Sequence, residues 1–257
     1  MKNVALVTGA SGGIGRELAR IHAAKGGDLV VVARSEDELR ELAAELKEKH
    51  GTEVKVLARD LALQGAAVEL HAAVEREGIE VDVLINNAGF GGYGLFYVRD
   101  WKIDESMIQL NVTTLTGLTR MFVPAMVERG RGRVLNLASM AGFLPGPLQA
   151  VYYATKAYVL SFTQAIAEEL KGTGVTATAL CPGPVETGFA EAADAEGVKA
   201  FDMAADPVLV ARKGYEAMES RDVIHVPGIA NKVAVQLPRF LPRKLVTKVS
   251  KKTMEKG

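Results

Sequence analysis

The feature that most constrains the fold of this 257-residue chain is a glycine-rich segment between an apolar run and a helical pattern. Val4–Val7 is continuously apolar, which is typical of a central parallel strand covered on both faces. The segment Thr8–Gly15 follows, and apolar residues recur at helical spacing from Ile14 onward. Its glycines let the backbone turn tightly and approach a pyrophosphate, and a helix N-terminus supplies free N–H groups. A glycine cluster is often only a turn, but this position predicts nucleotide binding.

Strand-like and helix-like segments alternate along the rest of the chain. The predicted strands cover residues 4–7, 29–33, 54–58, 81–85, 132–138, 175–180 and 223–226, and the longer predicted helices cover residues 35–50, 64–77, 104–129, 152–170 and 207–219. Ser35 and Glu38 form a capping box at the start of the first of these helices. The alternation predicts an α/β fold with a Rossmann-type, doubly wound parallel sheet. We expect a single domain over residues 1–228 and a basic helical C-terminal tail over residues 229–257.

Composition excludes several classes of protein. Basic and acidic residues both number 31, so the net charge gives no reason to expect nucleic-acid binding. Cys181 is the only cysteine, which rules out an internal disulfide framework and fits a reducing compartment. The histidines show no metal-ligand spacing, and no apolar stretch approaches the ~18 residues of a membrane span. We therefore expect a cytoplasmic protein without a bound metal.

The candidate catalytic residues are a phenol and an ammonium four positions apart, Tyr152 and Lys156, with the hydroxyl of Ser139 before them. Residues i and i+4 share one face of a helix, so the lysine cation is expected to lower the tyrosine pKa from about 10. A phenol tuned in this way can exchange a proton with an alcohol or ketone. Ser139 follows a predicted strand and is expected to meet this face. Taken alone, such a pair more often belongs to an ordinary amphipathic helix face, and its weight here comes from the segments that precede it.

Polar residues also follow three other predicted strands. After the second strand, Ala33 offers no acid for a ribose 2′-hydroxyl, whereas Arg34 suits a 2′-phosphate and predicts NADP(H); the alternative is a solvated surface charge. Asp60 follows the third strand. The segment Asn86–Gly89 follows the fourth, at the edge where open α/β sheets bind ligands, although two asparagines also favour a plain turn. Asn111 is an amide within an apolar helical pattern.

With these motifs in this order, and with Pro182–Gly183 after the sixth strand, the chain resembles the short-chain dehydrogenase/reductase family over residues 1 to about 226. The resemblance implies hydride transfer between a nicotinamide dinucleotide and a ketone or secondary alcohol. It implies that Tyr152 is the general acid/base and that Ser139 holds the substrate oxygen. Lys156 is implied to lower the tyrosine pKa and to bind the nicotinamide ribose, and Asn111 to hold a water for proton relay.

The same resemblance implies a set of cofactor-binding residues along the carboxyl edge of the sheet. They are Gly9, Ser11, Gly12, Gly13, Ile14, Gly15, Arg34, Asp60, Leu61, Asn87, Ala88, Gly89, Tyr152, Lys156, Pro182, Gly183, Val185 and Thr187.

Within this family, our leading hypothesis is an NADP(H)-dependent carbonyl reductase or alcohol dehydrogenase that acts on an apolar substrate. The chain lacks the Val-Asp-Gly-Gly ending of oxoacyl-carrier-protein reductases, so it looks more like the carbonyl-reductase and hydroxysteroid-dehydrogenase-like members. The alternatives are a 3-oxoacyl reductase of fatty-acid type and a non-catalytic dinucleotide-binding sensor or scaffold. The candidate pocket segments are residues 91–97, 143–148 and 189–203, which contain Tyr93, Phe96, Phe143, Leu144 and Phe201, and we expect Tyr153 to be a packing residue.

The resemblance also predicts a homodimer or homotetramer. Family members commonly pair the helices that correspond to residues 104–129 and 152–170. Apolar residues occur on more than one face of these helices: Met121, Phe122, Met126, Val159, Phe162 and Ile166.

The tail has a pronounced charge bias. Residues 231–257 contain eight basic residues and one acidic residue, and Leu241, Leu245 and Val249 form an apolar stripe at helical spacing. We favour packing of this stripe on the body or on a partner subunit. The alternative is a weak peripheral contact with an anionic membrane surface.

Overall fold

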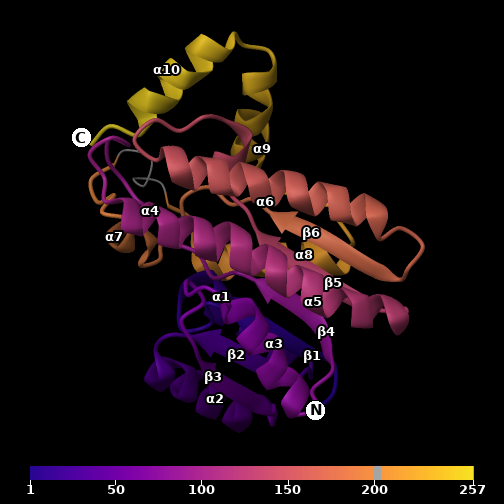
Figure 1. Cartoon of the computed structure of the whole chain (residues 1–257). Helices are drawn as coiled ribbons and strands as arrows, with labels where there is room; N and C mark the ends of the chain where they lie inside the picture. The colour runs from indigo at the N-terminus through magenta and orange to yellow at the C-terminus, as the bar shows by residue number, and fades with distance from the viewer. Residues whose placement is uncertain (199–203, 257) are drawn as a thin grey trace.

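The fold is built around one parallel sheet. The computed structural model describes residues 1–198 and 204–256, and in this part of the chain seven strands form the sheet in the order β3-β2-β1-β4-β5-β6-β7 (Figure 1). The strands are β1 (Val4–Thr8), β2 (Leu29–Ala33), β3 (Val54–Ala58), β4 (Val81–Asn86), β5 (Gly132–Leu137), β6 (Val175–Leu180) and β7 (Ile224–His225). The chain reverses its winding direction between β1 and β4. The predicted Rossmann-type, doubly wound sheet is confirmed.

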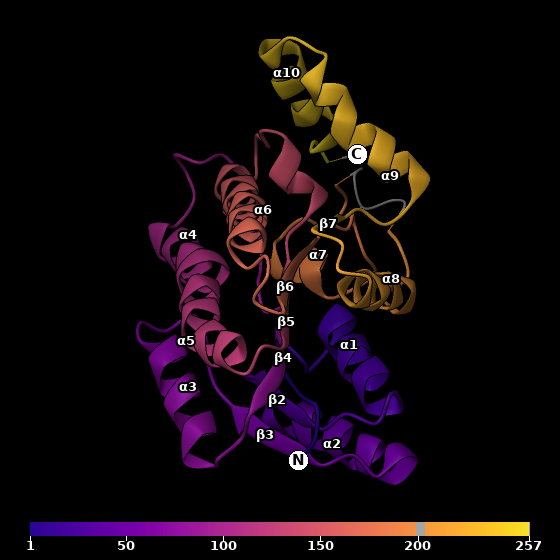
Figure 2. The ribbon, with the colours of Figure 1, turned by 90° about the vertical axis from the view of Figure 1, so that its right-hand side faces the viewer.

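Helices cover both faces of the sheet (Figure 2). One face carries α1 (Gly13–Ala24), α2 (Glu36–His50) and α8 (Pro207–Glu219). The other carries α3 (Ala66–Arg76), α5 (Leu115–Glu128) and α6 (Ala150–Glu169). Every residue of β1 and β2 is buried, which explains why these strands read as continuous apolar runs.

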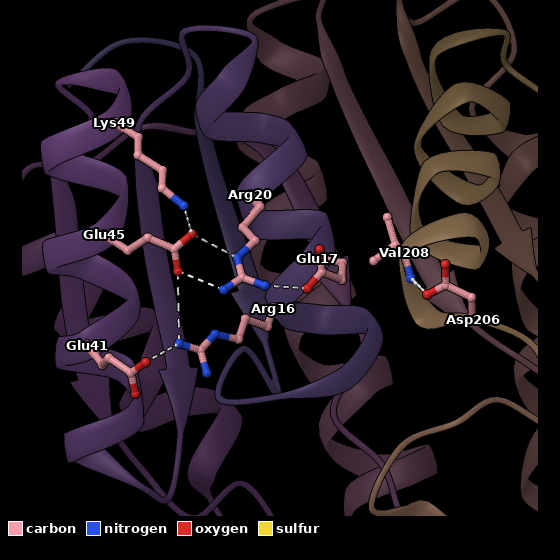
Figure 3. A network of polar contacts seen from close by, with 8 residues as sticks. All are labelled: Arg16, Glu17, Arg20, Glu41, Glu45, Lys49, Asp206 and Val208. Atoms are coloured by element: carbon pink, nitrogen blue, oxygen red, sulfur yellow. Dashed lines mark hydrogen bonds and ion pairs between the residues drawn. The ribbon is translucent and has the colours of Figure 1, made fainter.

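Ion pairs fix α1, the helix that follows the glycine turn, against α2 (Figure 3). Arg20 pairs with Glu45 of α2 and with Glu17 of its own helix, and the guanidinium lowers the pKa of Glu45 to about 2. Arg16 pairs with Glu41 at 2.9 Å. The predicted capping box at the start of α2 is wrong in one respect. Ser35 occupies the N-cap position, but its side chain makes no capping hydrogen bond.

The helical pattern over residues 104–129 is not one α-helix. It divides into α4 (Trp101–Ile108), a π-helical segment η1 (Gln109–Thr114) and α5. Polar side chains in η1 bond to other parts of the fold, as Thr114 does when its hydroxyl donates to the carbonyl of Leu61 at 2.8 Å. A π-segment adds a residue to the turn and re-aims the side chains around it, and such segments are frequent at functional sites.

The tail lies at one end of the molecule in both views, opposite the end that carries α2 and α3 (Figures 1 and 2). It consists of α9 (Ile229–Gln236), a 3₁₀ turn η4 (Leu237–Arg239) and α10 (Arg243–Thr253). The stripe of Leu241, Leu245 and Val249 is exposed, so the expectation that it packs on the body is wrong. Packing on a partner subunit, the other half of our favoured expectation, stays a prediction. The buried positions of this part of the tail lie one residue further along, at Val246, Ser250 and Met254. Among the described residues, no helix has both the length and the apolarity that crossing a membrane requires.

Candidate active site

The glycine turn is locked to the end of β4 by two side chains. The Thr8 hydroxyl accepts hydrogen bonds from the backbone N–H groups of Asn87 and Ala88, both at 3.0 Å. The Asn87 amide in turn donates to the carbonyls of Thr8 and Gly9 at 2.9 and 3.1 Å. Asn87 is therefore a structural clamp that holds two strand ends together, which excludes a plain surface turn.

The turn forms a cradle that suits a pyrophosphate. A Cβ atom at Gly15 would lie 2.3 Å from the carbonyl oxygen of Gly9, and Gly9 and Gly13 have positive φ angles, so glycine is required at these positions. A Cβ at Gly12 would instead meet nothing within 4 Å, so the turn has open space beside it. The N-terminus of α1 has no side-chain cap, and its free N–H groups and dipole favour an anion. These residues fit a dinucleotide, with Ser11 and Ile14 in the same turn.

The segment after β6 returns to this cradle. The methyl group of Thr187 lies 2.8 Å from the position of a Cβ at Gly13. Val185 is buried and forms an isolated β-bridge with Ala205. The carbonyl of Pro182 accepts a hydrogen bond from the backbone N–H of Met140 at 2.9 Å. The structure thus brings the residues expected near the nicotinamide, Pro182–Thr187, between the glycine turn and the segment that carries Ser139.

Ser139 and Tyr152 meet at the carboxyl end of β5. Ser139 is the N-cap of a 3₁₀ turn, η2 (Met140–Phe143), where its hydroxyl accepts from the N–H of Ala141 at 3.1 Å. The same hydroxyl donates to the carbonyl of Pro182 at 3.4 Å. It also lies close enough to the phenol of Tyr152, in the first turn of α6, to oppose the rise in the pKa of that phenol. Two hydroxyls from different elements therefore converge on one point.

The expected lowering of the Tyr152 pKa is wrong for this state of the protein. Burial raises the pKa of the phenol, and the nearby Ser139 hydroxyl only partly offsets this effect. The ammonium of Lys156 lies 5.7 Å from the centre of the Tyr152 ring and donates to the carbonyl of Leu137 at 2.7 Å. Burial also lowers the pKa of Lys156 to about 8. The helical spacing places both side chains on one face, but the ammonium is aimed at the end of β5.

Asn111 connects three elements around Lys156. Its amide donates to the carbonyl of Phe90 at 3.0 Å and to the hydroxyl of Thr155 at 3.2 Å, and its oxygen accepts from the N–H of Phe90 at 3.2 Å. A Cβ at Gly89 would lie 2.9 Å from the Asn111 oxygen and 3.6 Å from the Lys156 ammonium. Asn111 and Lys156 thus flank the backbone after β4.

Two free cations lie at the ends of β2 and β3. Arg34 is exposed, and so is Arg59, whose backbone N–H donates to the carbonyl of Ala33 at 2.8 Å. Neither guanidinium has an ion pair or side-chain hydrogen bond with a described residue. Arg16 is already held by Glu41. Sequence reasoning missed Arg59, although its position immediately before Asp60 at a strand end was the available signal.

The adenosine-side residues lie nearby. Asp60 is exposed and its carboxylate accepts from the N–H of Ala62 at 2.9 Å, as in an Asx turn. Leu61 is buried. Among the described residues, no three His, Cys, Asp or Glu side chains are grouped in a way that would hold a metal ion.

An apolar cluster lies next to Tyr152. Phe189 contacts the Tyr152 ring with a centroid distance of 5.1 Å. The cluster joins the three predicted pocket segments to the end of the tail, and its members are Tyr93, Leu148, Tyr153, Phe189, Ala193, Ala195, Val198 and Met254. Tyr153 packs here as expected. Its hydroxyl also donates to the sulfur of Met254 at 3.3 Å.

Two of the predicted pocket residues lie elsewhere. Phe96 is 61% exposed and lines a separate apolar hollow of about 430 Å³ between α4 and the start of α6. Phe143 packs against the core cluster that contains Val159 and Val235. Phe201 lies outside the described residues. Sequence reasoning also missed Gln149, the buried N-cap of α6, whose amide nitrogen has no hydrogen-bond partner among the described residues.

The fold and the site define the class: an α/β protein with a dinucleotide cradle and a Ser-Tyr-Lys-Asn group at the carboxyl edge of its sheet. The family model described as short chain dehydrogenase matches residues 3–197. The chain belongs to the short-chain dehydrogenase/reductase family.

Similar proteins differ in what they are named for. The very-long-chain 3-oxoacyl-CoA reductase of Rattus norvegicus is 36% identical over 73% of this chain. The match spans only 61% of the length of that relative. A short-chain dehydrogenase from Sphingobium yanoikuyae in complex with NADPH superposes with a TM-score of 0.83, at 31% identity over 92% of this chain and 93% of the other. A structure of a 7β-hydroxysteroid dehydrogenase gives a TM-score of 0.87, at 27% identity over 96% of both chains. A similar structure from Burkholderia phymatum is in complex with NAD, so the likeness does not decide the cofactor.

Proposed function

We propose that this chain is an NADP(H)-dependent oxidoreductase that interconverts a ketone and a secondary alcohol on a long apolar substrate. The observation that carries the proposal is the convergence of the Ser139 and Tyr152 hydroxyls between the dinucleotide cradle and the Phe189 cluster. A substrate carbonyl that binds both hydroxyls faces the dinucleotide cradle on one side and the apolar side chains of the Phe189 cluster on the other.

The residues account for the proton and for the charge on the substrate oxygen. The bound dinucleotide supplies the hydride. Ser139 and Tyr152 donate hydrogen bonds to the oxygen as it gains charge, and one such donor typically lowers a barrier by about 3–4 kcal/mol. Burial keeps the Tyr152 phenol protonated, as the proton donor of a reduction must be. The Lys156 cation, close to the same face, stabilises the phenolate that remains.

The choice of NADP(H) rests on Arg34 and Arg59. Both guanidiniums are exposed and free of acidic partners among the described residues, Arg34 at the end of β2 and Arg59 at the end of the neighbouring β3. A dinucleotide of this fold places its adenosine ribose at the end of β2. A guanidinium binds phosphate oxygens through charge-assisted hydrogen bonds. Neither Ala33 nor Arg34 offers the carboxylate that a 2′-hydroxyl prefers.

For the substrate, we place long-chain 3-oxoacyl thioesters first. The absence of a Val-Asp-Gly-Gly ending had weakened the 3-oxoacyl reductase alternative. That alternative now gains support from the relatives named very-long-chain 3-oxoacyl-CoA reductase. A 3-oxoacyl thioester carries a second carbonyl two bonds beyond the ketone. Gln149, three residues before Tyr152, has a buried amide N–H without a described partner, and such a group is costly unless something accepts its hydrogen bond. The thioester carbonyl supplies such an acceptor.

A bulky ketone or hydroxysteroid is the second candidate. The likeness to a 7β-hydroxysteroid dehydrogenase favours it, and so do the rings of Tyr93, Tyr153 and Phe189 in the apolar cluster. A sensor or scaffold without turnover is disfavoured, because burying the ammonium of Lys156 costs stability and such a protein has no use for it.

The test is NADPH oxidation by the purified chain with long-chain 3-oxoacyl-CoA, a 3-, 7- or 17-oxosteroid and a short aliphatic ketone as substrates. We expect the highest kcat/KM with the thioester. Gln149→Leu should lower kcat/KM for the thioester by about tenfold or more and leave the other ketones nearly unchanged. A preference for the steroid with no effect of Gln149→Leu selects the second candidate. No oxidation with any ketone overturns the proposed function.

A further inference from the structure

The tail presents an apolar surface that nothing in the described chain covers. Its residues are Leu237, Phe240, Leu241, Leu245 and Val249, all classed as exposed, with Phe240 at 84%. We call this set the tail apolar surface. Large apolar residues gathered on an exposed helical segment are typical of an interaction site.

The same segment is strongly basic, whereas the rest of the chain has a net negative charge. Residues 229–257 contain eight basic residues and one acidic residue, a net charge of +7, which leaves −7 for residues 1–228. All eight basic residues are exposed, and none forms an ion pair with residues 1–198 or 204–256. These charges are therefore available to a partner.

The tail packs on the rest of the protein through the face opposite the tail apolar surface. In α10, Val246, Ser250 and Met254 are buried while Leu245 and Val249 are exposed, so the apolar surface and the packing face are distinct. Val235 anchors α9 in the core cluster of Val159 and Val226. Lys248 and Lys252 follow Leu245 at i+3 and i+7, which places them beside the apolar side chains on α10. This arrangement of basic residues along an apolar stripe is that of a helix that lies in a membrane interface.

We propose that the tail docks this protein on an anionic lipid surface, with the tail apolar surface in the interface and the lysines near the headgroups. Charge favours lipid over a second copy. A symmetric contact between two tails would oppose +7 with +7, which disfavours association. An anionic leaflet attracts each of these charges.

The packing face of α10, opposite the docked surface, reaches the active-site cluster. Met254 ends the packing face of α10 and accepts a hydrogen bond from Tyr153, the neighbour of Tyr152. Lys256 lies 5.2 Å from the centre of the Tyr93 ring and forms a β-bridge with Val198. Docking therefore holds the apolar side of the site close to the lipid. The docking itself does not depend on the proposed function, but the advantage for an apolar substrate does.

The experiment is cosedimentation of the full-length chain with phosphatidylcholine vesicles, with and without phosphatidylserine, at low and high salt. We expect binding to the anionic vesicles that salt weakens. Lys248→Ala with Lys252→Ala should lower the partition coefficient roughly 30-fold. Leu245→Ser with Val249→Ser should lower it about tenfold or more.

The matched control is Leu63→Ser with Val68→Ser, which removes two apolar side chains that are even more exposed than Leu245 and Val249. They lie in or just before α3, at the other end of the molecule (Figures 1 and 2). It should bind like the unaltered chain. Thermal melts and light scattering accompany each variant. Binding that is equal for all variants, or independent of phosphatidylserine, overturns the proposal. So does a loss of oligomers in the Leu245→Ser, Val249→Ser variant without vesicle binding by the unaltered chain, because the surface would then be a subunit interface. Because binding is measured without substrate, the outcome is separate from that of the activity test.

Discussion

The amide nitrogen of Asn111 donates a 3.2 Å hydrogen bond to the hydroxyl of Thr155, the residue immediately before Lys156. This bond joins η1 to α6, so the helix that carries the proposed catalytic pair, Tyr152 and Lys156, is tied to the backbone after β4. The π-segment makes it possible, because the extra residue in the turn aims Asn111 at Phe90 and Thr155 instead of at its own helix. Asn111 therefore positions the surroundings of Lys156 through contacts that helical spacing alone does not predict.

Tyr152→Phe should fold and bind cofactor but lose turnover by at least ~10²-fold, since the phenol is the proposed proton donor and one of two donors to the substrate oxygen. Steady-state kinetics and cofactor titration measure the two effects. Tyr153→Phe is a matched control, because that neighbouring ring packs against Met254. It should keep turnover within a few-fold of the unaltered chain. Similar turnover in Tyr152→Phe and the control would remove Tyr152 from the mechanism.

Arg34→Ala and Arg59→Ala should each weaken NADPH binding by about 10- to 100-fold and leave NADH nearly unaffected. The reason is the loss of a charge-assisted contact to the 2′-phosphate, worth about 1.5–3 kcal/mol. Fluorescence titration with both cofactors measures the difference. Arg40→Ala is the control, because Arg40 is exposed on α2 but paired with Glu36. An equal loss for NADPH and NADH would show that these residues do not read the phosphate.

Lys156 should produce an alkaline limit to ketone reduction. Burial lowers the pKa of Lys156 to about 8, and burial raises that of Tyr152, so as pH rises the lysine loses its proton first. We expect kcat/KM, which reports the free enzyme, to fall above about pH 8. Lys156→Arg should move this limit upward because a guanidinium stays charged. A limit that stays in place in Lys156→Arg would belong to another group.

The positions of the strands were predictable from local composition. Strands β2, β3 and β6 have the predicted bounds. β2 is a buried apolar run, whereas β3 includes Lys55 and β6 includes Thr176 and Thr178, so short β-favouring segments between turns were the signal there. The π-segment was not, because it depends on hydrogen bonds from Asn111 and Thr114 to residues distant in sequence. Helical periodicity over residues 104–129 is compatible with both an α-helix and this interrupted one.

The sequence predicted that Ser139, Tyr152 and Lys156 would lie together, but it did not predict the electrostatics of this group. Spacing placed Tyr152 and Lys156 on one face, but the direction of the ammonium is set by the carbonyl of Leu137, at the end of a strand on another part of the chain. Arg59 was missed because its proximity to Ala33 arises from strand pairing. The same limit applies to the predicted interface residues, of which Phe122, Met126 and Val159 are buried in the chain's own core.

We still expect a homodimer, now through different residues of the same helices. The apolar hollow between α4 and α6 is lined by Phe96, Ile108 and Ala154, among others, and Tyr158 and Trp101 are exposed on the same pair of helices. Ala154→Arg places a charge in this hollow and should convert the dimer to a monomer. Light scattering at micromolar concentration measures the mass, with Ala154→Ser as the conservative control. A monomeric unaltered chain would contradict the prediction.

The last prediction concerns stability and a histidine outside the site. His22 is completely buried in α1, where its ring nitrogens contact the Tyr215 hydroxyl at 2.8 Å and the carbonyl of Asn3 at 2.6 Å. Burial lowers the pKa of His22 below its ordinary value of 6.5. The unfolded chain therefore binds a proton near pH 6.5 that the folded chain does not bind until a lower pH. Between these two pKa values the free energy of unfolding rises with pH, by at most about 1.4 kcal/mol per pH unit, and above about pH 6.5 this contribution is constant.

Urea unfolding at about pH 5.5 and about pH 7.5 measures this dependence. We expect the unaltered chain to be less stable at the lower pH. His22→Gln can keep the bond to the Asn3 carbonyl but cannot bind a proton, so its stability should be lower at neutral pH and should change less between the two conditions. Acidic residues contribute equally to both proteins, so the difference between the two pH dependences isolates His22. If the two proteins lose the same stability on acidification, His22 is not the titrating group.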